Sequence, residues 1–304
     1  MSTRVRVLSA GVVTGAGVGL AELSRVLAGT GPGPRSLADF EPAAHVPFRG
    51  TRQLCRTTQL ACVAAAEAVA GASAAWGSVA PERRAVSLGT EWGSIGPLAG
   101  FNRVVVGSGP QQTLPMSFPN VVVNVHAGHL GIFFDAGGPN LTVCGPAAGL
   151  EAVVEAVELI ELGRADIALA GASDAGDAPV GLPDLGVDAA LLVLSRAEVD
   201  GVAAVASYRV GPAVGAARDA LEEAELRPEE ADWWWDSAST EQPDHGAELR
   251  RRIGDCRAAH GAVLLAAAVE SVRQTQRPAL VVATSAPAAP GTAARAVALV
   301  IEPV

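Results

Sequence analysis

The spacing of apolar residues along the chain predicts alternating strands and helices. Short apolar runs bounded by glycine, proline or polar residues are typical of strands. Longer Ala-rich stretches that end at a glycine or a polar residue are typical of helices. We therefore expect strands at residues 4–13, 84–89, 141–143, 167–171, 188–194, 202–210, 232–236, 279–283 and 296–301, and helices at 20–28, 57–71, 147–162, 212–225 and 262–274.

The stretches between these elements predict turns and loops. Gly15, Gly17 and Gly19 follow the first strand, but their spacing is not that of a dinucleotide-binding fingerprint, so we expect a strand-to-helix turn and no cofactor. Residues 30–50 are rich in proline and glycine and predict a surface loop. Residues 102–120 carry turn residues, and we expect a helix to begin near Asn120.

The order of elements repeats along the chain. When residue 167 is placed against residue 280, the strand and the helix before it match in both parts of the sequence. Residues 86–91 match residues 236–241 in the same way. Each part reads strand, helix, strand, helix, strand, strand. This duplication predicts an α/β fold with two stacked sheets around a shared helical layer.

Composition limits the function. All 22 basic residues are Arg, against 32 acidic residues, for a net charge of −10. The chain has no lysine for chemistry, and its charge argues against nucleic-acid binding. No apolar run is long enough for a membrane span and no signal peptide is evident, so we expect a cytoplasmic protein. The four cysteines have no CxxC spacing, which predicts neither a metal site nor a disulfide framework.

Several segments in one order resemble the β-ketoacyl synthases of fatty-acid and polyketide assembly. These segments include SLGTEWGSI, LPMSFPNVVVNVHAGHLGIFFDAGGPNLTV and GLEAVVEAVELIELGRADIALAGASDA, and the resemblance is clear over residues 4–195. It implies the thiolase fold, in which duplicated βαβαββ halves form a five-layer αβαβα sandwich. We place the N-terminal half at residues 1–200 and a shortened C-terminal half at residues 201–304.

The resemblance also implies where catalytic groups would lie, and here the chain departs from the family. The family's nucleophilic cysteine falls on Pro146, and its first histidine on Asp236. Its second histidine falls on Gly261, one residue after His260, and its lysine falls on Cys256. We therefore expect no catalytic residues for condensation, and no cofactor or metal.

The resemblance implies a non-catalytic subunit similar to the chain-length factors of type II polyketide synthases. Its expected partners are an active ketosynthase, in a heterodimer, and an acyl carrier protein; a homodimer is the alternative assembly. In this fold dimerisation joins two sheets edge to edge. Residues 121–134 and the start of the helix at 147 would lie near that interface.

Two other functions stay open. Cys144 and His260 lie close to the family's catalytic positions, and a Cys–His pair would transfer or hydrolyse an acyl group. The plainer interpretation is that Cys144 is a small buried residue at a strand end. A carrier-binding scaffold would use the basic tract at residues 250–252 with Arg257, which otherwise forms a solvated helix face beside Glu248.

Two further motifs have structural interpretations. Trp233 and Trp235 would share one face of a strand and Trp234 the other, as sheet packing or as a wall of an acyl tunnel. His126 and His129 have an HxxH spacing, but no third metal ligand is placed by sequence, so packing or interface roles are favoured.

Overall fold

The computed structural model describes residues 4–30, 40–46, 48–175, 188–196, 199–235, 245–254, 256–285 and 294–304. The strands are β1 (Val5–Thr14), β2 (Gly17–Val18), β3 (Arg84–Thr90), β4 (Asn140–Cys144), β5 (Ile167–Asp174), β6 (Asp188–Arg196), β7 (Ala203–Pro212), β8 (Asp232–Trp235), β9 (Ala279–Thr284) and β10 (Arg295–Glu302). The α-helices are α1 (Leu20–Leu27), α2 (Arg56–Gly71), α3 (Ser73–Ser78), α4 (Ile95–Ser108), α5 (Val125–Phe133), α6 (Ala148–Glu161), α7 (Ala213–Glu223), α8 (His245–Ile253) and α9 (Ala259–Thr275). Short 3₁₀ turns include η2 (Thr51–Gln53), η4 (Pro110–Gln112) and η5 (Pro115–Val121).

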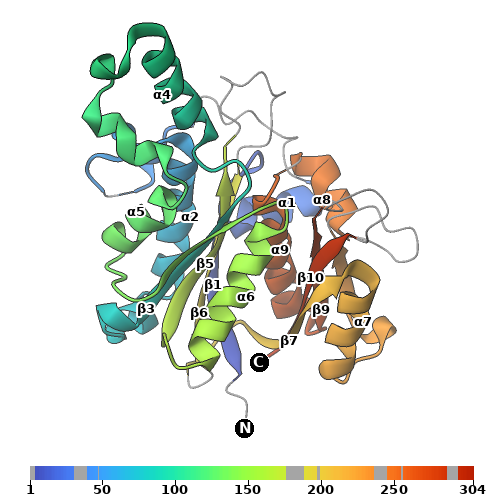
Figure 1. The fold of residues 1–304 in the computed structure, drawn as a ribbon. Helices are drawn as coiled ribbons and strands as arrows, with labels where there is room; N and C mark the ends of the chain where they lie inside the picture. The colour runs from blue at the N-terminus through green and yellow to red at the C-terminus, as the bar shows by residue number, and fades with distance from the viewer. Residues whose placement is uncertain are drawn as a thin grey trace.

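The described strands pair in the order β4-β3-β5-β6-β1-β7-β10-β9-β8, with β2 added to β1. The first five strands form the N-terminal half of the sheet and the last four form the C-terminal half. Between the halves, β1 and β7 pair antiparallel over residues 5–7 and 203–205. The two predicted sheets are therefore joined at one end, and they face each other across α6 and α9 (Figure 1).

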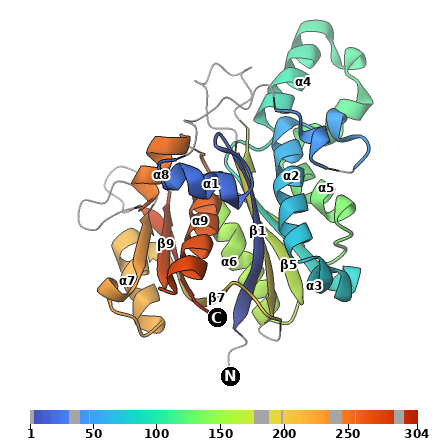
Figure 2. The same cartoon turned by 180° about the vertical axis from the view of Figure 1, so that it is seen from behind.

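The helices complete five layers. Helices α2 and α5 cover the outer face of the N-terminal half, and α7 covers the outer face of the C-terminal half (Figures 1 and 2). The central layer holds α6 and α9, which contact each other and strands of both halves. The predicted thiolase-type αβαβα sandwich is confirmed. In the N-terminal half, β5 and β6 pair antiparallel.

Burial on both faces explains why the inner strands have continuous apolar sequences. Every residue of β3 and β5 is buried, as is every residue of β6 except its last, because helices cover both sides of these strands. The central helix α9 is buried on nearly all sides over its first three turns. A helix that is apolar all round belongs in an interior, and its alanines and glycine let neighbouring backbones come close.

The structure corrects the boundaries of several predicted elements. The segment at 102–120 is not all turns, because α4 occupies residues 95–108 and the turn-forming residues follow its end. The helix expected near Asn120 begins five residues later, at Val125. Helix α9 begins at Ala259, three residues before the expected start. Within the part of the chain that the structure describes, no helix combines the length and apolar character of a membrane span.

Candidate functional site

The start of α6 meets the end of β3 and the start of α9 in one crowded place. A Cβ atom on Gly89 would lie 2.3 Å from the carbonyl oxygen of Ala148. A Cβ atom on Gly149 would lie 2.3 Å from the carbonyl oxygen of Ala258. Only glycine permits these approaches, so the three backbones converge where the family resemblance places the catalytic groups.

Pro146, on which the resemblance places the family's nucleophile, lies at this meeting point. It is exposed, it follows Gly145 at the end of β4, and it precedes Ala147, the N-cap of α6. A helix N-terminus favours a thiolate at such a position, but proline has neither a thiol nor a backbone N–H. The residue at this helix start therefore offers no nucleophilic side chain.

Two other positions where the resemblance places catalytic groups, Cys256 and Gly261, lie near the start of α9. Cys256 is buried, with its Sγ 3.8 Å from the carbonyl oxygen of Gly254. A Cβ atom on Gly261 would lie 3.0 Å from the Cβ of Ala283, so this position is a packing contact. His260 is 1% exposed in the first turn of α9. Asp236 lies outside the described residues.

Cys144, the candidate nucleophile of a rebuilt site, is an exposed residue at the end of β4. The interpretation of Cys144 as a small buried residue is therefore wrong. Partial desolvation of its thiol and the nearby negative charge of Asp174 both raise the pKa of Cys144. Because the thiolate is the reactive form, this environment opposes a nucleophilic role.

Asp174, which no sequence motif predicted as a site residue, is the polar centre of this region. It lies at the end of β5 with 1% of its surface exposed. One carboxylate oxygen accepts hydrogen bonds from Thr90 Oγ1 at 2.6 Å and Trp92 N at 3.1 Å. The other accepts from Glu91 N at 3.0 Å and Ala258 N at 3.2 Å.

These bonds tie the loop after β3 to the start of α9. Burial raises the pKa of Asp174, and the hydrogen bonds from the β3 loop partly oppose that rise. The signal that would have found it is an acidic residue closing a mostly apolar strand in AGASDA, since a buried carboxylate requires several donors.

The tryptophan prediction is confirmed. Trp233 and Trp235 lie on one face of β8 with ring centroids 6.1 Å apart. Trp234 faces the other side and packs on His245, with ring centroids 4.6 Å apart. Trp234 joins the central core and Trp235 the core under α7, which is the sheet-packing interpretation.

The structure also places the basic tract at residues 250–252 and the histidines His126 and His129. Arg251 and Arg252 both pair with Glu248 on α8, which is the solvated-face interpretation. His126 is fully buried, whereas His129 stacks on Phe133 with ring centroids 5.7 Å apart. Among the described residues, no group of three or more His, Cys, Asp or Glu side chains is placed to hold a metal ion.

Comparison with known proteins identifies the class. The model of the β-ketoacyl synthase N-terminal domain matches residues 35–184. The structure of the ishigamide ketosynthase/chain length factor superposes with a TM-score of 0.82 at 17% identity, covering all of both chains. A type II polyketide synthase acyl-carrier protein in complex with its ketosynthase gives a TM-score of 0.77 at 17% identity, again over all of both chains. These structures show the fold, which is that of the thiolase-fold ketosynthases.

Curated relatives agree over part of their length. The chain is 33% identical over 204 residues to a putative polyketide beta-ketoacyl synthase 1 of Streptomyces halstedii, covering 59% of this chain and 48% of the relative. It is 29% identical over 140 residues to 3-oxoacyl-[acyl-carrier-protein] synthase 2 of Staphylococcus aureus, covering 46% of this chain and 35% of the relative. The matches thus span between a third and a half of the relatives' length. The predicted resemblance to the β-ketoacyl synthase family is confirmed over these residues.

Proposed function

We propose that this chain is a non-catalytic ketosynthase-like subunit that pairs with an active ketosynthase in polyketide or fatty-acid-like biosynthesis. The observation that carries the proposal is Pro146 at the N-terminus of α6, where the fold presents a nucleophile. Cys256 and Gly261 support it, because both are packed into the interior in place of catalytic groups. The chain has no lysine, so the family's fourth catalytic group is absent under any alignment.

The proposed pairing surface is the β4 edge. Within the described sheet, β4 is the end strand beside β3, and its residues are exposed or half-buried. An unpaired strand edge is a template for pairing with another chain. Exposed apolar side chains gather on the neighbouring segment before and along α5, with Val122 at 41%, Val123 at 42% and Ile132 at 73% exposure. Such a patch marks a protein–protein contact.

The proposal has three further parts. The halves divide at residue 200, the protein is cytoplasmic, and an acyl carrier protein serves the assembled pair. The solved relatives support the carrier protein as a partner, since one contains a carrier protein bound to its ketosynthase. The Arg250–252 tract is not favoured as the docking site, because Glu248 already neutralises part of its charge.

Co-expression tests the pairing. The chain is produced with the ketosynthase encoded nearest to it in its genome, and the complex is measured by size-exclusion chromatography with light scattering. We expect a 1:1 complex that condenses acyl thioesters only when the partner keeps its own cysteine. Ile132→Glu places a charge on the proposed contact and should weaken the complex at least about tenfold.

Leu162→Glu is the matched control. Leu162 is 74% exposed at the far end of α6, so the same charge should leave the affinity unchanged. A chain that stays monomeric with every ketosynthase tried would overturn the pairing, and condensation by this chain alone would overturn its non-catalytic role.

A further inference from the structure

We propose a second reactive site, in which the Cys55 thiol accepts an acyl group from a thioester while His126 takes the thiol proton. The acyl chain would lie in a cleft under α4, which we call the α4 cleft. The choice of an acyl thioester as substrate rests on the proposed function, whereas the Cys–His pair and the cleft are features of the structure. The sequence suggested a Cys–His pair at Cys144 and His260, whereas the structure brings Cys55 and His126 together.

The thiol and the imidazole lie within contact distance. Cys55 Sγ is 3.6 Å from His126 Nδ1 and 3.2 Å from Thr58 Oγ1. Thr58 Oγ1 is itself 2.8 Å from His126 Nδ1. These atoms come from the start of α2 and the start of α5, 71 residues apart in sequence between cysteine and histidine. A nucleophile beside a base is the arrangement that activates a thiol.

The surroundings of His126 leave Nδ1 as the acceptor. Ser94 Oγ donates to the carbonyl oxygen of Val122 at 3.0 Å. Its oxygen therefore accepts the N–H of His126 Nε2, which lies 3.2 Å away. Burial, followed by the nearby His129, lowers the pKa of His126 to about 4. The imidazole is neutral at neutral pH, and the lone pair on Nδ1 faces both the Thr58 hydroxyl at 2.8 Å and the Cys55 thiol at 3.6 Å.

Cys55 also occupies a helix N-terminus. It is the N-cap of α2, a helix of 16 residues, and it has an extended backbone. The unpaired N–H groups and the dipole of a helix start favour a negative charge, which supports thiolate formation during attack. Cys62, about two turns further along α2, is the contrasting thiol: burial raises its pKa to about 12.

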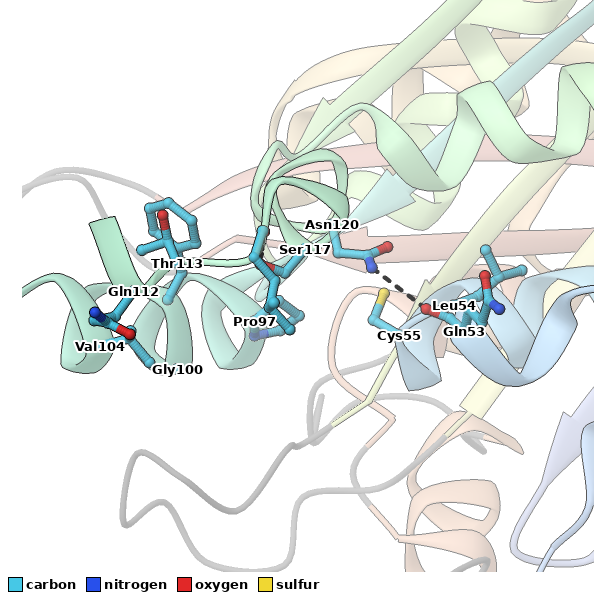
Figure 3. Close-up of a pocket in the computed structure, with 12 residues that line it drawn as sticks. Gln53, Leu54, Cys55, Pro97, Gly100, Val104, Gln112, Thr113, Ser117 and Asn120 are labelled. Atoms are coloured by element: carbon cyan, nitrogen blue, oxygen red, sulfur yellow. Dashed lines mark hydrogen bonds between the residues drawn. The ribbon is translucent and has the colours of Figure 1, made fainter. Parts of the chain in front are cut away.

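The α4 cleft gives the thiol access to a ligand. Its volume is about 550 Å³, within the range of small-molecule sites, and Cys55 is half-buried in its wall. Figure 3 shows Cys55 between the start of α2 and the segment carrying Asn120. The apolar side chains suited to an acyl chain are Leu54, Pro97, Phe101, Val104 and Leu114.

The reaction is an exchange of thioesters. The Cys55 sulfur forms a bond to the acyl carbonyl carbon, and the bond from that carbon to the donor sulfur breaks. The thiol proton passes to His126 Nδ1 and then to the departing donor thiolate. The products are an acylated Cys55 and a free donor thiol, so atoms and electrons balance without an oxidant or a metal.

The test uses octanoyl-N-acetylcysteamine as the acyl donor with the purified full chain. Intact mass and peptide mapping should show one octanoyl group, on Cys55. Cys55→Ser should abolish it, and Cys144→Ser, the matched control, should react as the wild type does. His126→Gln should slow acylation at least about tenfold, because a positioned base contributes about 10²- to 10⁴-fold. Thermal melting checks that each variant folds.

Two outcomes would reject the site: acylation mapped to Cys144, or an unchanged rate in a folded His126→Gln variant. If the His126→Gln variant does not fold, comparing acylation of the wild type with that of Cys55→Ser still decides whether Cys55 is the acylated residue. Binding of Cys55→Ser to the ketosynthase partner separates the two proposals. Intact pairing without wild-type acylation rejects only this site, whereas acylation without pairing rejects only the proposed function.

Discussion

The two halves of the sheet share their inner side and differ on their outer side and at their ends. In the N-terminal half, β4 precedes α6, α5 covers the outer face, and α4 lines the α4 cleft. In the C-terminal half, α8 precedes α9 among the described residues, and α7 covers the outer face. Both halves nevertheless pack on the same pair of central helices, whose side chains form the largest core.

This difference separates packing from chemistry. The central layer is constrained from both sides, so its small residues and close backbone contacts persist. The loops and helix starts at the ends of the strands are constrained less, and the replaced catalytic positions that we propose lie there. Under that proposal, the fold keeps its core while the site changes.

The largest effect is expected at the centre. Gly149→Ala would place a methyl group 2.3 Å from the Ala258 carbonyl oxygen, and α6 or α9 would have to shift. We expect the free energy of unfolding to fall by about 3 kcal/mol, as overpacking does. Chemical denaturation measures it.

Gly128→Ala on α5 is the control for that substitution. No heavy atom lies within 4 Å of its new Cβ, so the helix should gain up to about 1 kcal/mol. Equal costs at the two glycines would mean that the central contact does not hold the halves together.

A pH effect is expected in the outer layer of the N-terminal half. The pKa of His126 is lowered to about 4 in the folded state, chiefly by burial. Unfolded His126 binds its proton near pH 6.5, so stability should be lost as pH falls from about 6.5 to about 4, by up to about 3 kcal/mol. Denaturation from pH 7 to pH 4 should show a flatter profile for His126→Gln than for the wild type.

Asp174 acts in the opposite direction, because its pKa is raised and its protonation on acidification favours the folded state. Asp174 is present in both the wild type and His126→Gln, so its contribution to the pH dependence of stability cancels when the two profiles are compared. His129→Gln is the control, since burial lowers its pKa in a more open environment and its removal should flatten the profile less. Identical profiles for wild type and His126→Gln would contradict the buried neutral imidazole.

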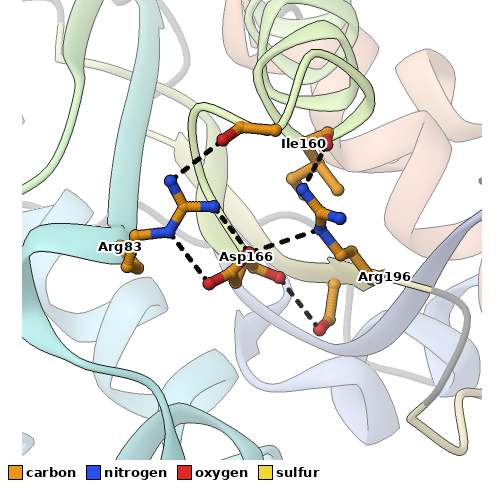
Figure 4. A network of polar contacts seen from close by, with 6 residues as sticks. Arg83, Ile160, Asp166 and Arg196 are labelled. Carbon is orange, nitrogen blue, oxygen red and sulfur yellow. Dashed lines mark hydrogen bonds and ion pairs between the residues drawn. The ribbon is translucent and has the colours of Figure 1, made fainter.

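The smallest effect is expected at the base of the N-terminal half. Arg83 holds Asp166 with two hydrogen bonds, of 2.9 and 2.7 Å, and Arg196 lies 3.3 Å from the same carboxylate (Figure 4). Asp166, just before β5, is thereby linked to the turn before β3 and to the end of β6, but it is 38% exposed. Asp166→Asn should therefore cost about 1 kcal/mol at low salt and less at high salt.

Glu270→Gln in the C-terminal half is the comparison. Glu270 pairs with Arg273 within a single helix, so its loss should cost about 0.3 kcal/mol. A larger cost for Glu270 than for Asp166 would reverse the view that the network between strands contributes more.

The sequence predicted the layers better than the ends of elements. Apolar strands such as β5 and β6 and the Ala-rich α6 have patterns that local physics determines, because continuous burial requires apolar residues. Helix α4 was missed because only Gly96 on it is buried, so no periodic apolar face marks it. The join between β1 and β7 was not predicted, since pairing between distant strands has no local signal.

For the site, the sequence by itself determined what is missing. A chain without lysine has no lysine for chemistry whatever its fold, and proline at position 146 brings no thiol. Only the tertiary structure decided which remaining groups meet. Asp174 gathers donors from β3 and α9, and Cys55 meets His126, because the folded layers bring together residues far apart in the chain. Reactivity depends on distances, burial and tautomers, and these exist only once the chain has folded.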